Sequence, residues 1–400
     1  MIERLQISQL RNLHAVKISA GACNVLIGAN GSGKTSCLEA IFLLSRGKSF
    51  RHHQPKRYIE HHHEAVTVFA TLTDGSSLAI QKQLDATTTL RLNHSNVYSQ
   101  SALTSLLPTL IIDPSSMEML EQGSTNRRQL LDWLVFHMKP SFHPQWLAYQ
   151  RLLKQRNQLL KQPKPLSNAQ LSELRAWDSG LSNHAALIHH YRRQVFDAWQ
   201  PYFKDIIAKL LPQFAEQLTL SYSAGFDTDR PLDEQLAERL EQDLQLGYSR
   251  IGSHRADVHV HWRSKSAGKV DNDEALNTLN ETKTIKEQAA NVLSRGEKKL
   301  LITALKLSQL PLLTQETVDK AAVPTKTTAP RAAPIVLVDD VTAELDDRAI
   351  HILLTTLSKL PCQVFITSLT EDIISLIHSH WQTPKLFHVK HGQVSEFLLD

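Results

Sequence analysis

The chain has 400 residues, and its 44 lysines and arginines against 40 aspartates and glutamates give a formal net charge of +4. This length allows about two or three domains with cores of their own, and so small a charge excludes a chain that is basic throughout, so any nucleic-acid surface must be a local patch. The 3 scattered cysteines, the absence of a signal-peptide pattern and the lack of a membrane-length apolar run lead us to expect a cytoplasmic protein without a membrane partner.

The first predicted elements are strands within 2–27, where apolar residues alternate and then form a continuous run at 25–27. This run leads into GANGSGKT at 28–35, which fits every fixed position of the phosphate-binding loop G-x-x-x-x-G-K-[ST]. The apolar spacing that follows predicts a helix over 36–45, so the positive end of the helix faces the anion. We therefore expect a nucleotide site at the end of a buried strand.

The residue types of this loop suit a nucleoside triphosphate with Mg²⁺. Its glycines are expected to adopt positive backbone dihedrals, so that successive N–H groups face phosphate oxygens. Lys34 supplies a charge for the β- and γ-phosphates and a role in catalysis, and the Thr35 hydroxyl is a ligand for Mg²⁺. The predicted ATP-binding residues are Gly28, Ala29, Asn30, Gly31, Ser32, Gly33, Lys34, Thr35 and Ser36.

An antiparallel sheet is predicted after this helix. Two strands, at 65–72 and 78–80, flank the hairpin signal Asp74-Gly75, and a further strand is predicted at 89–92. The tract EHHHE at 60–64 precedes them and invites a metal hypothesis. Neighbouring residues on a loop point in different directions, and no second ligand cluster has a recognisable spacing, so we favour an exposed polar loop.

Residues 114–247 have a helical pattern, with sparse glycine and apolar residues three and four apart, and we interpret them as a helical domain inserted into the nucleotide-binding lobe. No carboxylate occurs between Asp132 and Glu173, while several basic residues do, which favours contact with a phosphate backbone or simply a solvated helix face. The candidate DNA-binding residues are Arg127, Arg128, Lys154 and Arg156, and the first two are alternatively structural partners of Asp132.

Two polar segments, at 263–287 and 314–334, are predicted to be flexible surface insertions. Between them lies LSRGEKK at 293–299, followed by an apolar helix. Ser294 and Glu297 have the spacing of a capping box, and a serine and glycine at a helix start form a second anion site. One triphosphate rarely needs both sites from one molecule, so we expect a head-to-tail dimer in which Ser294, Arg295 and Gly296 close over the γ-phosphate of the partner copy.

The last predicted site element is the run IVLVDD at 335–340, a buried parallel strand that ends in two carboxylates. This is the Walker B pattern. We expect Asp339 to hold Mg²⁺ and Asp340 to orient the attacking water as the catalytic carboxylate.

Together these motifs resemble the ATPase head of ABC-type proteins of the SMC/Rad50 kind, with a D-loop at 343–346. Within that superfamily the chain is most similar to the RecF family of bacterial repair proteins, over nearly its whole length. Segments that ABC heads in general do not carry support this likeness: LRN at 10–12, GKSFR at 47–51, NRRQLLDW at 126–133, LLKQRN at 152–157 and GSHRAD at 252–257.

The resemblance implies an α/β fold: an ABC-ATPase-like head at 1–113 and 248–400, with an antiparallel β subdomain, and an inserted α-helical domain at 114–247. It also implies an ATP-dependent homodimer that uses ATP and Mg²⁺, binds single- and double-stranded DNA at gapped junctions, and helps the RecO and RecR proteins load the RecA recombinase. The implied roles are DNA repair, recombination, replication and the SOS response to DNA damage.

The chain departs from the family pattern in several places. Glu297 stands where glutamine is usual, Ser253 replaces a proline, and 107–114 lacks a clear Q-loop glutamine. Thr367 occupies the place of the switch histidine of ABC transporters, and Asp340 is one methylene shorter than the glutamate of many ABC heads. Because both features loosen the positioning of water, we expect slow, DNA-dependent ATP hydrolysis that acts as a switch.

Two other classes compete with this interpretation. An ATPase subunit of a membrane transporter would usually carry the switch histidine, whereas this chain has Thr367. An SMC-like structural chromosome protein would need long heptad arms, whereas 114–247 is interrupted by Pro140, Pro144, Pro163, Pro165, Pro201 and Pro212.

Overall fold

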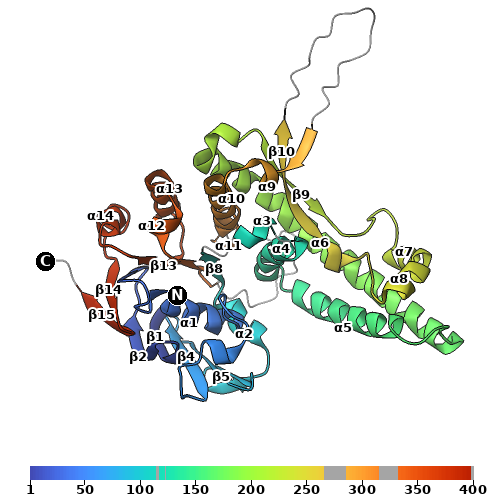
Figure 1. Ribbon diagram of the computed structural model, residues 1–400, viewed down its shortest axis with the longest axis horizontal. Coiled ribbons are helices and arrows are strands. Elements are labelled where there is room, and N and C mark those ends of the chain that lie inside the picture. The colour runs from blue at the N-terminus through green and yellow to red at the C-terminus, as the bar shows by residue number, and fades with distance from the viewer. Residues whose placement is uncertain (114–116, 122, 265–284, 315–331, 398–400) are drawn as a thin grey trace, which may run out of the picture. The chain divides into compact units, whose positions relative to one another are not determined.

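The computed structural model describes residues 1–113, 117–121, 123–264, 285–314 and 332–397 (Figure 1). The chain divides into two compact units. The first consists of 1–116 with 310–400, and the second of 117–309. No helix in the part of the chain that the structure describes is both long and apolar enough to cross a bilayer.

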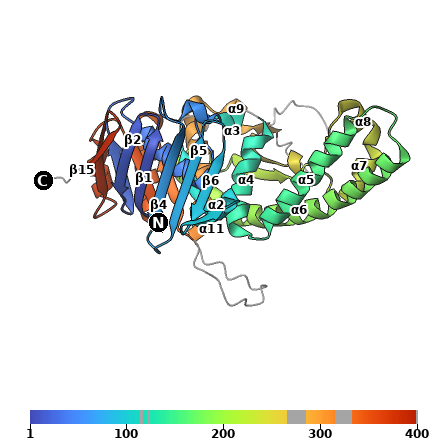
Figure 2. The same ribbon diagram turned by 90° about the horizontal axis from the view of Figure 1, so that it is seen from below.

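The first unit contains an antiparallel sheet of six strands in the order β2-β1-β4-β5-β6-β7. Strands β1, β2, β4 and β5 lie side by side in both views (Figures 1 and 2), and Figure 2 shows β6 beside β5. Every second residue of β4 is buried, which is the alternation expected of a strand with one face on the core. The strands are β1 (Ile2–Leu10), β2 (Leu13–Ser19), β4 (Ala65–Leu72), β5 (Ser77–Gln83), β6 (Thr88–Leu92) and β7 (Ser95–Val97).

The second sheet of this unit has the order β15-β14-β3-β13-β12-β8 and is parallel from β14 to β8. Strands β3 and β12 are buried at every position, which explains their continuous apolar sequences. The strands are β3 (Cys23–Ile27), β8 (Thr109–Ile112), β12 (Ile335–Val338), β13 (Gln363–Ser368), β14 (Lys385–Lys390) and β15 (Gln393–Phe397).

Helix α1 (Lys34–Arg46) joins these two sheets in one apolar core, since its side chains cluster with residues of β1, β4, β12 and β13. Burying α1 on nearly all sides fixes the direction of its N-terminus, which the short loop 28–33 connects to β3. The other helices of the unit are α2 (Gln100–Leu106), α11 (Leu310–Thr314), α12 (Val341–Glu344), α13 (Asp347–Ser358) and α14 (Ile373–His378), with a 3-10 turn at Pro55–Arg57.

The second unit is mostly helical, and α5 (Phe142–Leu160) runs beside the long α6 (Asn168–Leu210) (Figure 2). It also contains a small antiparallel sheet in the order β11-β10-β9. Its remaining elements are α3 (Glu118–Glu121), α4 (Ser124–Met138), α7 (Leu232–Glu238), α8 (Leu240–Leu246), α9 (Ala289–Val292), α10 (Arg295–Leu307), β9 (Leu218–Ser223), β10 (Asp257–Ser264), β11 (Ile285–Gln288) and 3-10 turns at Pro212–Phe214 and Ser253–Arg255.

The predicted α/β fold class is confirmed, and so are the N-terminal strands, the hairpin at Asp74-Gly75 and the helix after the phosphate-binding loop. The predicted insertions at 263–287 and 314–334 fall mostly on 265–284 and 315–331, which lie outside the described residues. The assignment of 114–247 as a domain inserted into an ATPase head stays a prediction.

Candidate functional site

Three neighbouring parallel strands of the first unit bring the predicted nucleotide residues together. Strands β3, β13 and β12 lie side by side, so their carboxyl ends meet at one edge of the sheet. The phosphate-binding loop follows β3, Thr367 lies near the end of β13, and Asp339 and Asp340 follow β12. This is the edge at which open α/β sheets bind ligands.

The loop glycines are needed for two different reasons. Gly31 and Gly33 have φ values of 76° and 119°, a region in which a side chain is strained, as the sequence predicts. For Gly28 that prediction is wrong, because Gly28 is not among the positive-φ residues. A Cβ there would lie 2.2 Å from the carbonyl oxygen of Val389, so close approach of β14 requires this glycine.

Lys34 is folded back onto its own loop. Its ammonium donates to the carbonyl oxygens of Gly28 at 2.6 Å and Ala29 at 3.0 Å. Burial lowers the pKa of Lys34, and the charges of Asp340 and Asp339 oppose that shift. Lys34 lines the same cavity as the two acidic residues at the end of β12, and its ammonium can turn there from the carbonyls toward a phosphate.

Asp339 is the centre of a hydrogen-bonded group. The Thr35 hydroxyl donates to Oδ1 at 2.9 Å, and the Thr367 hydroxyl donates to the same oxygen at 2.9 Å. Burial raises the pKa of Asp339; the two hydroxyls lower it, and the nearby carboxylates of Asp113 and Asp340 raise it again. A threonine hydroxyl next to a buried carboxylate is the oxygen pair that a P-loop protein uses for Mg²⁺.

Asp340 has an unusual backbone and an unpartnered oxygen. Its φ of 50° and ψ of 58° are left-handed, and its N–H donates to the Thr367 hydroxyl at 2.7 Å. Its Oδ1 is buried without a hydrogen-bond partner among the described residues. A buried oxygen of this kind is satisfied by a ligand or a water that the site is built to hold.

These residues line a cavity of about 340 Å³. Its walls are Arg11, Asn12, the loop residues Asn30, Gly31, Ser32, Gly33, Lys34, Thr35 and Ser36, then Arg51, Asp339, Asp340 and Thr367. Ser32 also has a buried hydroxyl without a hydrogen-bond partner in the described structure. The orphaned Ser32 and Asp340 oxygens, with the Lys34 ammonium and the Thr35–Asp339 pair, fit the phosphates and the metal of Mg²⁺·ATP.

Four residues at or beside the site were not predicted from the sequence. Arg11, Asn12 and Arg51 were noticed only as parts of family-like segments, yet they line the cavity. Asn12 donates from Nδ2 to the Gly31 carbonyl at 3.1 Å, which joins the β1–β2 turn to the phosphate-binding loop. Asp113 follows the apolar strand β8 as Asp339 follows β12, and that shared pattern was the available signal.

The predicted signature segment belongs to the second unit. Ser294 caps α10, since its hydroxyl accepts from the Glu297 N–H and the Glu297 carboxylate accepts from the Ser294 N–H. The capping box is therefore confirmed, and the unusual Glu297 preserves it. Ser294, Arg295 and Gly296 are all exposed, so this helix end is open to a neighbour. Asp346 of the predicted D-loop caps α13 through the Ala349 N–H.

Two of the candidate DNA residues, Arg127 and Arg128, are engaged within the second unit. Arg127 forms a two-pronged ion pair with Asp257, at 2.9 and 2.7 Å, and its side chain is 13% exposed. Arg128 donates to the carbonyl oxygen of Ala256 at 2.9 Å. Asp132, the structural partner suggested as the alternative, forms its hydrogen-bonded ion pair with Arg192, while its charge also acts on Arg128.

Arg156 contradicts its assignment as a DNA contact. It is completely buried and donates to Asp178, Asp243 and Ser249 at 2.6 to 2.7 Å. A guanidinium enclosed in this way cannot reach a phosphate backbone. Lys154, two residues earlier on α5, is exposed and remains a candidate.

The family-like segments of the second unit thus have a structural role. The segments at 126–133, 152–157 and 252–257 supply both residues of the Arg127–Asp257 pair and one residue of each pair made by Arg156 and Asp132. Arg192 also donates to the Ser253 carbonyl at 2.7 Å. Pairs of this kind join α4 to β10 and α6, and α5 to α6 and α8.

Comparison with known proteins agrees with this geometry. A family model described as RecF/RecN/SMC N terminal domain matches residues 1–393. The chain is 39% identical over 396 residues to the DNA replication and repair protein RecF of Acinetobacter baumannii (strain SDF), with 98% of each chain covered. It is 36% identical over 405 residues to RecF of Pseudomonas putida (strain W619), covering 99% of this chain and 98% of the relative.

Solved structures show the same fold. A structure of the recombination mediator protein RecF with ATP superposes with a TM-score of 0.76 at 22% identity and covers 99% of both chains. An Smc head bound to the C-winged helix domain of ScpA gives a TM-score of 0.55 at 14% identity, covering 100% of this chain and 98% of the other. The ABC-ATPase-like fold predicted from the sequence is therefore confirmed.

Proposed function

Since the chain belongs to the RecF family of DNA replication and repair proteins, we propose that it is an ATP-dependent DNA-binding protein of recombinational repair and replication-fork maintenance. One observation carries the ATP-dependent part: Lys34, Thr35 and Asp339 meet in one cavity although 304 positions separate the last two in the chain. A phosphate-binding loop beside two carboxylates suits binding and hydrolysis of ATP.

Each residue of this cavity has its own proposed role in hydrolysis. When bound, Mg²⁺ would offset charge on the phosphate oxygens, and Thr35 and Asp339 are the residues that would hold it. Lys34 would turn from the Gly28 and Ala29 carbonyls to the phosphates. Asp340 would accept a hydrogen bond from the attacking water, because its Oδ1 lacks a partner in the described structure.

The same contacts favour slow turnover. Thr367 holds both Asp339 and the backbone of Asp340, so its hydroxyl is not free to donate to a phosphate. The aspartate side chain is also one methylene short of a glutamate, which leaves the water less firmly placed. We therefore propose that the function depends on the ATP-bound state of the protein more than on its rate of ATP turnover, and that DNA stimulates the hydrolysis.

The N-terminus of α10 is the proposed contact between two copies of the chain. It is capped and exposed, and Ser294, Arg295 and Gly296 offer a hydroxyl, a positive charge and a close backbone approach. We propose that ATP held by one copy binds this helix end of a partner copy, so that ATP drives homodimerisation. Hydrolysis then removes the γ-phosphate and releases the pair.

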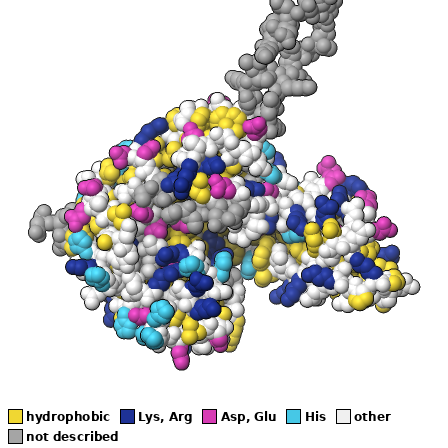
Figure 3. Space-filling model, in the orientation of Figure 1, with side chains coloured by type: hydrophobic (Ala, Val, Ile, Leu, Met, Phe, Trp, Pro, Cys, Tyr) yellow, Lys and Arg dark blue, Asp and Glu magenta, His cyan; other side chains and the backbone are white. Residues whose placement is uncertain are grey.

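The DNA substrate and the protein partners come from the family. We propose binding at single- and double-strand junctions of gaps, in concert with the RecO and RecR proteins that load RecA, in the cytoplasm. Lysine and arginine side chains are numerous on the visible face of the second unit (Figure 3), and exposed Lys154 is the candidate contact that its structure leaves open. The full-length family match does not favour a transporter ATPase or a structural chromosome protein.

The test is the mass of the purified protein in light scattering, with and without Mg²⁺·ATP and a gapped DNA. We expect a monomer that becomes a dimer with ATP and a DNA-bound dimer with both. A protein that stays monomeric at saturating ATP would refute the proposed dimer while leaving the ATP site intact.

Ser294→Asp isolates the contribution of α10. Aspartate caps a helix as well as serine does, so the fold is kept, but its charge repels a γ-phosphate. We expect ATP to be bound and dimerisation to be lost. Ser167→Asp is the matched control, because Ser167 caps α6 with the same kind of capping box. Equal loss in both variants would contradict the assignment.

A further inference from the structure

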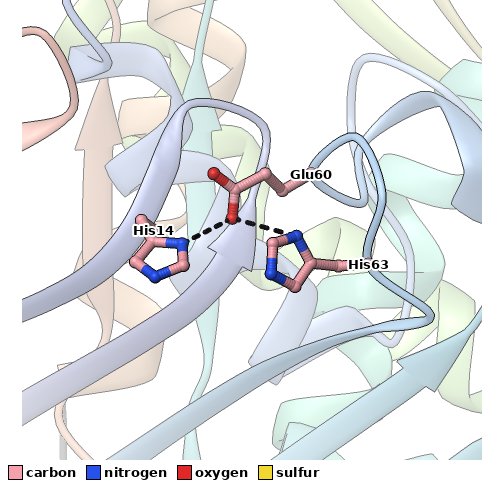
Figure 4. Close-up of side chains that lie close together, drawn as sticks. All are labelled: His14, Glu60 and His63. Atoms are coloured by element: carbon pink, nitrogen blue, oxygen red, sulfur yellow. Dashed lines mark hydrogen bonds and ion pairs between the residues drawn. The ribbon is translucent and has the colours of Figure 1, made fainter.

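Three side chains from two segments of the first unit converge outside the nucleotide cavity (Figure 4). His14 comes from β2, while Glu60 and His63 belong to the loop before β4. The His14 Nδ1 lies 3.0 Å from the Glu60 Oε2, and the His63 Nδ1 lies 3.5 Å from the same oxygen. One possible ligand atom from each residue lies within 4.8 Å of the others.

We propose that His14, Glu60 and His63 form a binding site for one divalent transition-metal ion of the Zn²⁺ class. Tetrahedral zinc with bonds of about 2.0–2.2 Å places its ligand atoms roughly 3.3–3.5 Å apart. The two distances to Glu60 are already near this value. Small rotations about the histidine side-chain bonds bring the two histidine nitrogens to the same separation, and water completes the coordination shell on the exposed side of His14.

The donor set selects the kind of ion. Two imidazole nitrogens and one carboxylate oxygen suit Zn²⁺, Ni²⁺ or Cu²⁺, whereas Mg²⁺ and Ca²⁺ prefer oxygen alone. The site is thus chemically distinct from the oxygen ligands of Thr35 and Asp339. The His63 Nδ1 also lies 3.2 Å from the His61 carbonyl oxygen, so an ion bound through this nitrogen replaces that contact.

The backbone around the cluster is held in place by contacts independent of any metal. The Arg11 N–H donates to the Tyr58 carbonyl at 2.7 Å, and the Glu60 N–H donates to the Gln9 carbonyl at 2.9 Å. Tyr58 and Ile59 are buried between these bonds. The loop is therefore attached to the β1–β2 hairpin before a metal arrives, which lowers the entropic cost of binding.

The position of the site gives it a structural consequence. His14 is two residues beyond Asn12, which lines the nucleotide cavity, and the loop contacts the same hairpin. An ion held by both segments would restrain the turn that carries Arg11 and Asn12. The expected effect is a more stable first unit, measurable without nucleotide and therefore independent of the proposed ATPase.

Histidines gather on one visible face of the molecule (Figure 3), so adventitious binding must be separated from this site. The full-length protein without nucleotide is titrated with Zn²⁺ by calorimetry, and with Co²⁺ as a spectroscopic probe of tetrahedral coordination. We expect one site per chain, with affinity reduced at least about tenfold in His14→Ala, His63→Ala and Glu60→Gln. Zn²⁺ is expected to raise the melting temperature of the original chain by several degrees.

His62→Asn is the matched control. His62 lies in the same loop, and asparagine tolerates its positive φ of 66°. Its binding curve should match that of the original chain. Unaltered binding by the double variant His14→Ala, His63→Ala would overturn the site, and so would an equal loss in His62→Asn. The side chain of His14 is 70% exposed, so His14→Ala should leave the melting temperature of the metal-free protein unchanged. If that temperature falls, the Zn²⁺ affinity of Glu60→Gln, which keeps the side-chain shape, decides whether the site exists.

Discussion

Asp339→Asn should make the nucleotide-free protein more stable while removing its response to Mg²⁺·ATP. Asp339 is 8% exposed, and burial together with the charges of Asp113 and Asp340 raises its pKa. An amide of the same shape removes the buried charge and still accepts from the Thr35 and Thr367 hydroxyls. Stabilising substitutions of this size contribute about 0.5–2 kcal/mol, and each kcal/mol raises the melting temperature by about 2–4 °C in a unit of 150–250 residues.

The pH dependence has a definite sign. Because the pKa of Asp339 is raised above its ordinary value of 3.8, the folded protein keeps a proton that the unfolded chain has lost. The stability contributed by that proton is fully present below pH 3.8 and is lost as the pH rises through the folded pKa. The advantage of Asp339→Asn should therefore be small in acid and largest at neutral pH.

Mg²⁺·ATP should reverse the order of the two proteins. A ligand at 100 times its Kd adds about 2.7 kcal/mol to the free energy of unfolding, and the variant lacks the carboxylate that would hold the metal. Calorimetric melting of both proteins with and without Mg²⁺·ATP measures both effects. If the variant melts lower without nucleotide at neutral pH, or gains as much from Mg²⁺·ATP as the original chain, the reasoning is wrong.

Three further substitutions test the structural and functional roles separately. Arg156→Ala should lower the free energy of unfolding by about 3–5 kcal/mol, since it leaves buried Asp178 and Asp243 uncompensated. Exposed Lys154→Ala should change stability by less than about 0.5 kcal/mol but reduce the salt slope of DNA binding by about 1; equal losses of stability in urea melts would contradict this distinction. Lys34→Arg should keep ATP binding and ATP-driven dimerisation while losing most hydrolysis, and an unaltered steady-state rate would refute its role.

The sequence predicted the features that depend on neighbouring residues. The continuous apolar runs at 25–27 and 335–338 become fully buried strands because a strand covered on both faces has no need of alternation. The spacing of Ser294 and Glu297 predicts a capping box for the same local reason, since both hydrogen bonds lie within one helical turn. The common edge of β3 and β12 followed from the rule for parallel sheets.

Features that depend on distant pairings were beyond the sequence. Arg156 lay in a run of basic residues, yet its partners are 22 and 87 residues further along the chain. His14 lay outside the histidine tract, 46 residues before Glu60, and only the pairing of the hairpin with the loop joins them. Gly28 was predicted to have a positive φ, but the reason for a glycine there is the nearby carbonyl oxygen of Val389, which no local pattern reveals.

The geometry of Asp340 links the stability of the site to its proposed use as a switch. A left-handed backbone costs a residue other than glycine about 1–2 kcal/mol, and a buried oxygen without a hydrogen bond costs about 1–3 kcal/mol. Thr367 keeps Asp340 in this state, since its hydroxyl binds both the Asp340 N–H and the Asp339 carboxylate. A ligand or a water that bonds to the free oxygen removes the second cost but leaves the backbone in place. ATP binding is therefore favoured, while the Asp340 carboxylate is held too rigidly to move with an attacking water. This combination suits a protein that binds ATP readily and hydrolyses it slowly.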